Sequence, residues 1–423
     1  MLTPADAALV HRDPALPGLA AVLDPEVVLD RSGPAEHGPR AVNAEATYVR
    51  YKPGTSCVVG YRLATDAGPV LAYAKAFHPG DNAKLGKARE KEAPNPVVGW
   101  GVFTDHTDTV LVATASSDRD LPALAALTDA DRRKALLRRL VGGDPDLWHV
   151  EPRPMRHKPE RRWLGLVERD GAPVALLKAY RVDDVNAARA GQELLAVPAV
   201  PPLGWSRRFA VLASTWVPGP PLSDALTTTA PVDAALVGAA LAQLHALPPS
   251  RRLPRIDDRH TIGAVVEAAE AVAVLNPELR SRACRLADRI SSALRALPPL
   301  TTVVHGDFSA DQVILTEPAV TIIDFDRAAV ADPAADLGSF AADLDRSELA
   351  GRLAPGRAAA ITAEMIGGHR HAGGPPTGDR VVVHQAAALL RLATAPFRER
   401  LPDWPTATGT IFRRAEAVAA ELP

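Results

Sequence analysis

Two stretches in the first half of the chain show the same succession of apolar and polar positions. Residues 50–63 (RYKPGTSCVVGYRL) and 156–169 (RHKPERRWLGLVER) each predict a strand, a polar turn and a second strand. An apolar strand with one lysine follows in each, AYAKAF around Lys75 and ALLKAY around Lys178. A polar, helix-like stretch with a glutamate comes next. The pattern predicts one supersecondary unit that is present twice.

The spacing of matching residues supports this duplication. Counterparts in the two copies lie 103 to 106 positions apart, and small loop insertions explain the drift. The matching pairs are Lys52 and Lys158, Lys75 and Lys178, Glu90 and Glu193, and Trp100 and Trp205. Two copies are too few for a solenoid.

From about residue 218 onward the apolar positions recur with a helical period. Residues 232–247 place their apolar side chains on one helix face. Further helices are predicted over 261–275, 277–297, 381–397 and 406–422. The run 367–379, rich in Gly, Pro and His, predicts a loop.

Residues 301–326 (TTVVHGDFSADQVILTEPAVTIIDFD) interrupt this helical half with short β-branched runs. If residues 317–319 form a three-residue hairpin loop, Gln312 lies directly opposite Asp324. Directly opposed Cβ atoms are about 4.5–5.5 Å apart, so an amide oxygen and a carboxylate can share one cation. Oxygen ligands suit Mg²⁺, which takes further ligands from phosphates. The register depends on the length of the turn.

Asp307 lies five residues before Gln312, in the loop that follows the first of these strands. Phosphoryl transfer to a hydroxyl needs a metal and a lysine on the phosphates, and a carboxylate that accepts the acceptor's proton. Asp307, Gln312, Asp324 and Lys178 supply these parts. A single Asp in a loop is more often a turn former, but the flanking strands favour a site here.

The use of lysine strengthens this interpretation. The chain strongly prefers Arg to Lys and has no lysine after Lys178, yet both copies keep one at matching places. An ammonium is a compact point charge, which a planar guanidinium does not replace freely. The alternative is a lysine that extends from a strand end into solvent.

Composition limits the class of protein. The 423 residues carry 48 Lys and Arg against 50 Asp and Glu, a net charge of −2 that argues against a nucleic-acid binder. Cys57 and Cys284 form no cysteine framework or zinc motif, which fits a reducing cytoplasm. Neither a signal peptide nor a membrane span is recognisable, so we expect no membrane partner. The length suggests two or three domains.

The segments HGDFSADQVIL (305–315) and IIDFD (322–326) resemble the aminoglycoside phosphotransferase and choline kinase family, relatives of the protein kinases. This resemblance implies an α+β, protein-kinase-like bilobal fold with ATP between a β-rich N-lobe and a mostly helical C-lobe. We expect a duplicated N-lobe-like cap domain over 1–145, the kinase N-lobe and hinge over 146–217, and the C-lobe with the catalytic and metal site over 218–423.

The resemblance also implies roles for individual residues. Those implied roles are Asp307 as catalytic base, Gln312 and Asp324 as Mg²⁺ ligands, Lys178 on the α- and β-phosphates, Glu193 as its helix partner, and His305 as a support of the catalytic loop. The segment 211–222 resembles the family's hinge, which places Thr215 and Val217 at the nucleotide.

Two departures from the family pattern stand out. Gln312 replaces the usual asparagine, although the maltokinase-like branch tolerates glutamine and also carries an N-terminal cap. The turn HKPERR (157–162) has no glycine, so we expect Arg161 or Arg162 to contact phosphate instead.

These features predict an ATP-dependent small-molecule kinase that phosphorylates a hydroxyl of a sugar, amino sugar or aminoglycoside-like acceptor. The alternative is a catalytically weak pseudokinase or nucleotide-sensing binding protein. The first copy is interpreted as a degenerate lobe that packs as a cap. The alternative is that it binds a second nucleotide. His245 is expected in the core, Asp336 at a helix cap or against the catalytic loop, and His369 in an acceptor-binding or merely exposed loop.

Overall fold

The computed structural model describes residues 2–31, 41–90, 92–95, 97–98, 101–104, 109–193, 200, 202–228, 232–316 and 318–422. The chain forms two compact units. The first unit comprises Met1–Val185, Pro202–Trp216 and Phe397–Pro402, and the second comprises Asn186–Pro201, Val217–Pro396 and Asp403–Pro423. Trp100 of the predicted repeat lies outside the described residues.

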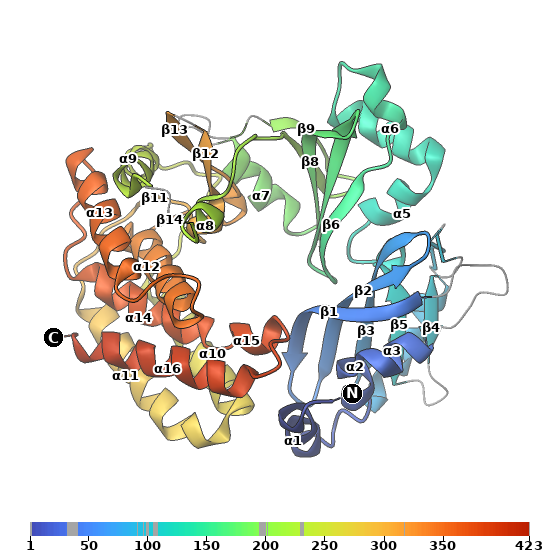
Figure 1. Cartoon of the computed structure of the whole chain (residues 1–423), viewed down its shortest axis with the longest axis horizontal. Helices are drawn as coiled ribbons and strands as arrows, with labels where there is room; N and C mark the ends of the chain where they lie inside the picture. Colours follow the sequence, from blue (N-terminus) through green and yellow to red (C-terminus); the bar gives the residue numbers. More distant parts are fainter. Residues whose placement is uncertain are drawn as a thin grey trace. The chain divides into compact units, whose positions relative to one another are not determined.

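The first copy of the repeat folds into a five-stranded antiparallel sheet in the order β1-β2-β3-β5-β4. Its strands are β1 (Ala41–Lys52), β2 (Ser56–Thr65), β3 (Gly68–Phe77), β4 (Val102–Thr104) and β5 (Val110–Thr114). Figure 1 shows β1, β2 and β3 side by side. The short helices of this copy are α1 (Pro4–Arg12), α2 (Leu19–Leu23), α3 (Pro25–Arg31) and α4 (Asn82–Arg89).

The second copy repeats this topology in the order β6-β7-β8-β10-β9, which confirms the predicted duplication. Its strands are β6 (Arg153–Lys158), β7 (Arg162–Arg169), β8 (Ala172–Tyr180), β9 (Pro202–Ser206) and β10 (Val211–Thr215), and helix α7 (Val185–Gln192) follows β8 along the chain. Lys75 and Lys178 occupy matching places, each on the third strand of its sheet and each flanked by paired strands on both sides.

Strand alternation explains how β8 presents its lysine. Successive side chains of a strand point to opposite faces, so Leu177 and Lys178 lie on different faces of the sheet. Leu177 packs in an apolar cluster with Leu136 and Leu140 of helix α6 (Ala130–Leu140). Helix α5 (Ala123–Thr128) contributes to the same cluster. Lys178 therefore lies on the face of β8 opposite to these helices.

The second unit is mostly helical and contains two short two-stranded antiparallel sheets. The sheets pair β11 (Thr302–Val304) with β14 (Ala329–Ala331), and β12 (Val313–Thr316) with β13 (Ala319–Ile322). The helices are α8 (Leu222–Ala225), α9 (Ala234–His245), α10 (Asp258–Leu275), α11 (Arg280–Ala296), α12 (Ala334–Leu349), α13 (Arg357–His371), α14 (Arg380–Leu392), α15 (Ala395–Arg398) and α16 (Trp404–Ala420). Both sheets pack into the same apolar core as α9 and α12.

The predicted loop over 367–379 is wrong in its first part, because α13 continues to His371. His369 is buried there and its imidazole bonds to His245 of α9. Gly368 permits this close packing, since a Cβ at that position would collide with the backbone of Ala235. Tertiary packing thus overrides the low helix propensity of the glycines.

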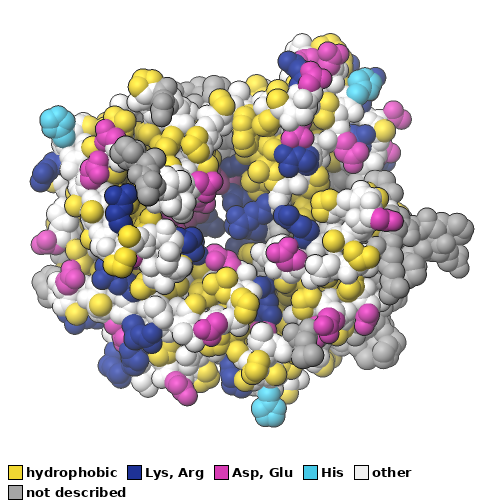
Figure 2. Space-filling view, in the orientation of Figure 1, with side chains coloured by type: hydrophobic (Ala, Val, Ile, Leu, Met, Phe, Trp, Pro, Cys, Tyr) yellow, Lys and Arg dark blue, Asp and Glu magenta, His cyan; other side chains and the backbone are white. Residues whose placement is uncertain are grey.

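Surface properties agree with the composition. Lys and Arg side chains and Asp and Glu side chains are both scattered over the face shown in Figure 2, which agrees with the net charge of −2. Among the described helices, none is both long enough and apolar enough to cross a membrane.

Candidate active site

The loop His305-Gly306-Asp307 begins at the end of β11 and is held by Asp336 of α12. The backbone N–H of His305 donates to Oδ2 of Asp336 at 2.7 Å, and the N–H of Gly306 donates to Oδ1 at 2.8 Å. Asp336 is 1% exposed. Charge-assisted bonds from two successive amides fix the loop backbone, so Asp336 braces the loop.

His305 links this loop to the β12–β13 hairpin. Its ring is fully buried, and Nε2 donates to the carbonyl oxygen of Ile323 at 2.8 Å. The backbone N–H of Ile323 donates in turn to the carbonyl oxygen of Gln312 at 2.9 Å. Ile323 therefore joins three segments, those that carry Asp307, Gln312 and Asp324.

Gly306 allows the loop to approach the segment after Asp324. Its φ is +81°, a conformation that favours glycine. A Cβ at this position would overlap the carbonyl oxygen of Arg327. The glycine between His305 and Asp307 is thus required by both backbone conformation and space.

The predicted register of the β12–β13 hairpin is wrong by one residue. Val313 pairs with Ile322 and Thr316 pairs with Ala319, so two residues separate the paired strand ends instead of three. The shorter turn shifts every pair by one, and Gln312 faces Ile323 instead of Asp324. A one-residue shift exchanges the faces of a strand.

The position of Asp324 is set by a turn of the backbone and not by the predicted strand pairing with Gln312. Its φ of +66° places it in the left-handed region, which Asp tolerates better than most residues because its short polar side chain can bond locally. The backbone turns there and ends the strand. Asp324 and Gln312 are partly exposed and Asp307 is exposed, so all three side chains are accessible to solvent.

The donor chemistry of Gln312 and Asp324 fits a magnesium ion. Together they offer an amide oxygen and a carboxylate, and Mg²⁺ binds through one or two carboxylates, waters and phosphate oxygens. In the described part of the chain, no group of three or more His, Cys, Asp and Glu side chains is arranged for a metal.

A chain of buried polar groups continues behind Asp336. Nε2 of His245 lies 3.1 Å from Oδ2 of Asp336, and Nδ1 of His245 lies 3.0 Å from Nε2 of His369. Burial, together with the nearby His245, lowers the pKa of His369 to about 4. Burial raises the pKa of Asp336, but the hydrogen bond and charge of His245 outweigh it, so the pKa lies below its usual value. His245 is a core residue as predicted, whereas His369 lies in no exposed loop.

The remaining predicted residues belong to both units. Lys178 is 5% exposed on β8, and Thr215 ends β10 with an exposed side chain, both in the first unit. Glu193 and Val217 belong to the second unit. Glu193 pairs with Arg189 at 2.8 Å and with Arg252 at 2.5 Å. The pairing of Lys178 with Glu193 and the nucleotide contacts of Thr215 and Val217 stay predictions.

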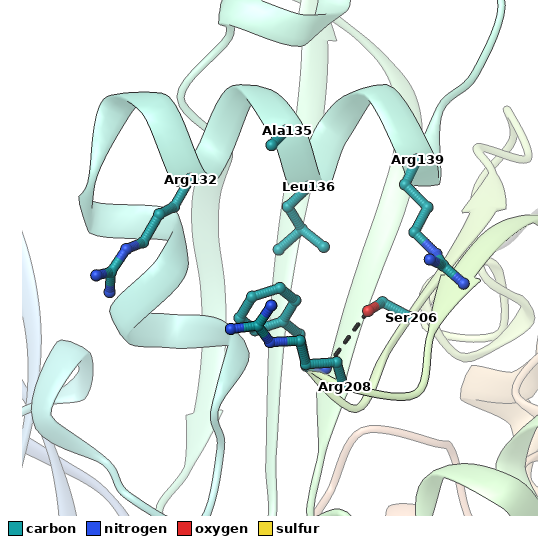
Figure 3. Close-up of a pocket in the computed structure, with 7 residues that line it drawn as sticks. Arg132, Ala135, Leu136, Arg139, Ser206 and Arg208 are labelled. Carbon is teal, nitrogen blue, oxygen red and sulfur yellow. Dashed lines mark hydrogen bonds between the residues drawn. The ribbon is translucent and has the colours of Figure 1, made fainter.

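A separate cavity of about 460 Å³ lies between α6 and the β9–β10 turn of the first unit (Figure 3). None of the predicted site residues lines it. Its lining residues are Arg132, Ala135, Leu136, Arg139, Ser206, Arg208 and Phe209. The Arg139 side chain donates to the carbonyl oxygen of Trp205, and the Arg208 guanidinium lies 5.2 Å from the ring centroid of Phe209.

Comparison with known proteins places this geometry in a family. The sequence profile of the phosphotransferase enzyme family (APH) matches residues 125–372, more than half of the chain. No curated protein sequence matches significantly.

Several solved structures resemble the chain. Choline kinase from Cryptosporidium parvum Iowa II is 12% identical with a TM-score of 0.51, covering 70% of this chain and 96% of that one. The aminoglycoside phosphotransferase APH(3'')-Id from Streptomyces rimosus is 22% identical with a TM-score of 0.45, covering 60% and 96%. A choline/ethanolamine kinase family protein from Mesorhizobium loti is 19% identical with a TM-score of 0.46, covering 62% and 85%. At such identities the likeness concerns the fold alone.

The family match and the fold lead to the same conclusion. The chain has a protein-kinase-like α+β fold and belongs to the phosphotransferase enzyme family, whose aminoglycoside phosphotransferases and choline kinases act on hydroxyl groups.

Proposed function

We propose that this phosphotransferase is an ATP-dependent small-molecule kinase, with the acceptor a sugar, amino sugar or aminoglycoside-like polyol. The observation that carries the proposal is that the segments bearing Asp307, Gln312 and Asp324 are linked at Ile323, whose carbonyl accepts from His305 and whose N–H donates to Gln312. A carboxylate base, together with an amide and a second carboxylate that can hold a metal ion, is the set that phosphoryl transfer to an alcohol requires.

Asp307 is the proposed catalytic base. Its carboxylate orients the acceptor hydroxyl and takes its proton while the oxygen of the acceptor forms a bond to the γ-phosphorus. The bond from that phosphorus to the bridging oxygen breaks, and its electron pair leaves with ADP. Asp336 keeps the Asp307 loop in place through the amides of His305 and Gly306.

Gln312 and Asp324 are the residues that would hold Mg²⁺. When bound, the ion would neutralise the charge of the nucleotide phosphates. Lys178 is proposed to place its ammonium on the α- and β-phosphates, with Glu193 as its partner, and Thr215 and Val217 are proposed to contact the nucleotide base. The free thiols of Cys57 and Cys284 suit a reducing compartment, and we place the activity in the cytoplasm.

Composition favours neutral acceptors. Cationic antibiotics call for an acidic acceptor pocket, yet no acidic cluster stands out in the sequence between 360 and 410. Sugars need a mixed set of hydrogen-bonding groups instead. We therefore rank neutral sugars above cationic aminoglycosides as acceptors.

An ADP-release screen over monosaccharides, disaccharides, amino sugars and aminoglycosides tests the proposal. Asp307→Asn serves as the blank, and loss of a general base predicts a kcat lower by about 10²- to 10⁴-fold. Asp311→Asn is the matched control, because Asp311 is an exposed carboxylate in the same segment. Nucleotide binding should persist in Asp307→Asn.

Two results would contradict the proposal. Near wild-type turnover of Asp307→Asn removes Asp307 as the base. Stabilisation of the wild type by ATP without transfer to any acceptor favours the nucleotide-sensing alternative, for which Gln312 and the glycine-free 157–162 turn are the motivation.

A further inference from the structure

The turn between β6 and β7 in the second copy is bound to the sheet of the first copy, within the first unit. Glu160 lies at the tip of this turn with a φ of +58°. Its Oε1 lies 2.5 Å from Nζ of Lys75 on β3, and its Oε2 pairs with the guanidinium of Arg50 on β1. One carboxylate thus bridges two cations of the first copy.

The burial of these groups makes the contact stronger than a surface ion pair. The side chains of Lys75 and Glu160 are each 16% exposed, and that of Arg50 is 20% exposed. Charge-assisted hydrogen bonds that are shielded from water are stronger than exposed pairs.

The backbone of the turn is held as well. Oδ2 of Asp118, whose side chain is fully buried, accepts from the Glu160 N–H at 2.8 Å. The same oxygen lies 2.8 Å from Nε2 of His157 on β6. Side chain and main chain of the turn are therefore fixed at one place.

Packing completes the attachment. The ring of Tyr73 on β3 meets the ring of His157 edge to face, with centroids 5.9 Å apart. Pro159 lies against Gly60 of β2, where an added Cβ would come within 3.2 Å of the proline Cδ.

Lys75 occupies the same position in the first sheet as Lys178 does in the second. The Glu160 carboxylate contacts the ammonium of Lys75 in the way that a nucleotide phosphate is proposed to contact the ammonium of Lys178. We propose that Glu160 is a tethered anion that fills the lysine site of the first copy, and that the first copy thereby positions the β6–β7 turn for nucleotide binding by the second. The positioning part rests on the proposed function.

The surrounding charges fit a single carboxylate better than a polyphosphate. Asp118 and Asp120 lie near Glu160, and burial together with the charges of Glu160 and Asp118 raises the pKa of Asp120. A triphosphate would meet the same repulsion with more charge. Glu90, the counterpart of Glu193, is exposed, while Lys75 pairs with Glu160. The chain should therefore bind one nucleotide.

Removing the tethered charge tests this inference first without nucleotide. In Glu160→Gln and in Lys75→Met, amide hydrogen exchange over residues 156–162 should become at least about tenfold faster, because the turn loses its anchor. Glu168→Gln is the matched control, since it removes an exposed ion pair with Arg153 from the other end of β7. Unchanged exchange in both variants overturns the anchoring.

Kinetics then test the positioning. Glu160→Gln should raise KM for ATP at least about threefold and change kcat less than twofold, since the ordering of the turn is lost but the chemistry is not. The double variant Lys75→Met with Glu160→Gln should match Glu160→Gln alone in both exchange and KM, because the two substitutions remove the same contact. An unchanged or lower KM in Glu160→Gln, or fully additive effects in the double variant, overturns the positioning role.

The proposed function can fail separately. A wild type without turnover on any acceptor refutes the kinase, yet the exchange measurement on the same variants still decides the anchor. Isothermal titration with the non-hydrolysable analogue AMP-PNP should give one site per chain, and two sites would overturn the filled lysine site.

Discussion

The two sheets of the first unit share strand order and a lysine on the third strand, but the surroundings of the two lysines differ. Lys75 is neutralised by a carboxylate that comes from the other copy. Lys178 is buried on the face opposite to α6, and its copy is the one followed along the chain by the His-Gly-Asp loop. The same scaffold thus carries an anchored lysine in one copy and, in the other, the lysine that we propose contacts the nucleotide phosphates.

Replacing each lysine by methionine is the strongest test of this difference between Lys75 and Lys178. Lys178→Met should lower kcat/KM by about 10- to 150-fold, because a charge-assisted contact to phosphate contributes about 1.5–3 kcal/mol. Lys75→Met should leave kcat within about twofold, since its partner is Glu160 and not the nucleotide. Steady-state ADP release measures both. Equal losses of kcat/KM in the two variants would mean that the copies do not differ in the proposed way.

A second difference is that the first copy is followed by no His-Gly-Asp loop. Behind this loop in the second unit lies the buried carboxylate of Asp336. Asp336→Asn should lower the free energy of unfolding by about 1–3 kcal/mol, because an amide cannot accept from two N–H groups and the buried imidazole of His245 at once. Urea denaturation measures the effect. Asp311→Asn is the control and should lower it by less than about 0.5 kcal/mol. A loss as small as that of the control would show that the brace is dispensable.

Acid should weaken the second unit through His369. The folded pKa is about 4 and the ordinary value is 6.5, so the unfolded chain binds the extra proton between these limits. Stability is complete above pH 6.5 and falls toward pH 4, by at most about 1.4 kcal/mol per pH unit from this residue. His369→Gln should flatten that part of the profile in denaturation series at fixed ionic strength. An unchanged slope would remove His369 as its source.

Much of the fold could be predicted because its signals are local. The repeated strand pattern and the steady offset of the two lysines predicted the first three strands of both sheets, and helical periodicity located α10, α11, α14 and α16 close to their observed bounds. The motif around Asp307 predicted a strand, a loop and a hairpin, and all three are present.

The errors arise where distant segments decide the outcome. The hairpin register depended on a turn shorter by one residue, which no strand pattern reveals. The end of α13 depended on a partner for His369 that lies 124 residues away. The partner of Lys75 lies 85 residues away, in the turn expected to cover phosphate. Pairing of buried polar groups is a tertiary property, and residue type alone does not reveal it.

The left-handed backbone at Asp324 has a consequence for how this protein can change. Asn and Gly occupy such a conformation readily, whereas a β-branched residue there would strain the turn. A descendant that exchanges Asp324 for Asn or Gly would keep a residue type suited to this turn while losing the charge that we propose holds Mg²⁺. Under the proposed function, loss of phosphoryl transfer and loss of the fold can therefore occur independently, and an inactive relative of this protein would still fold around the same loop.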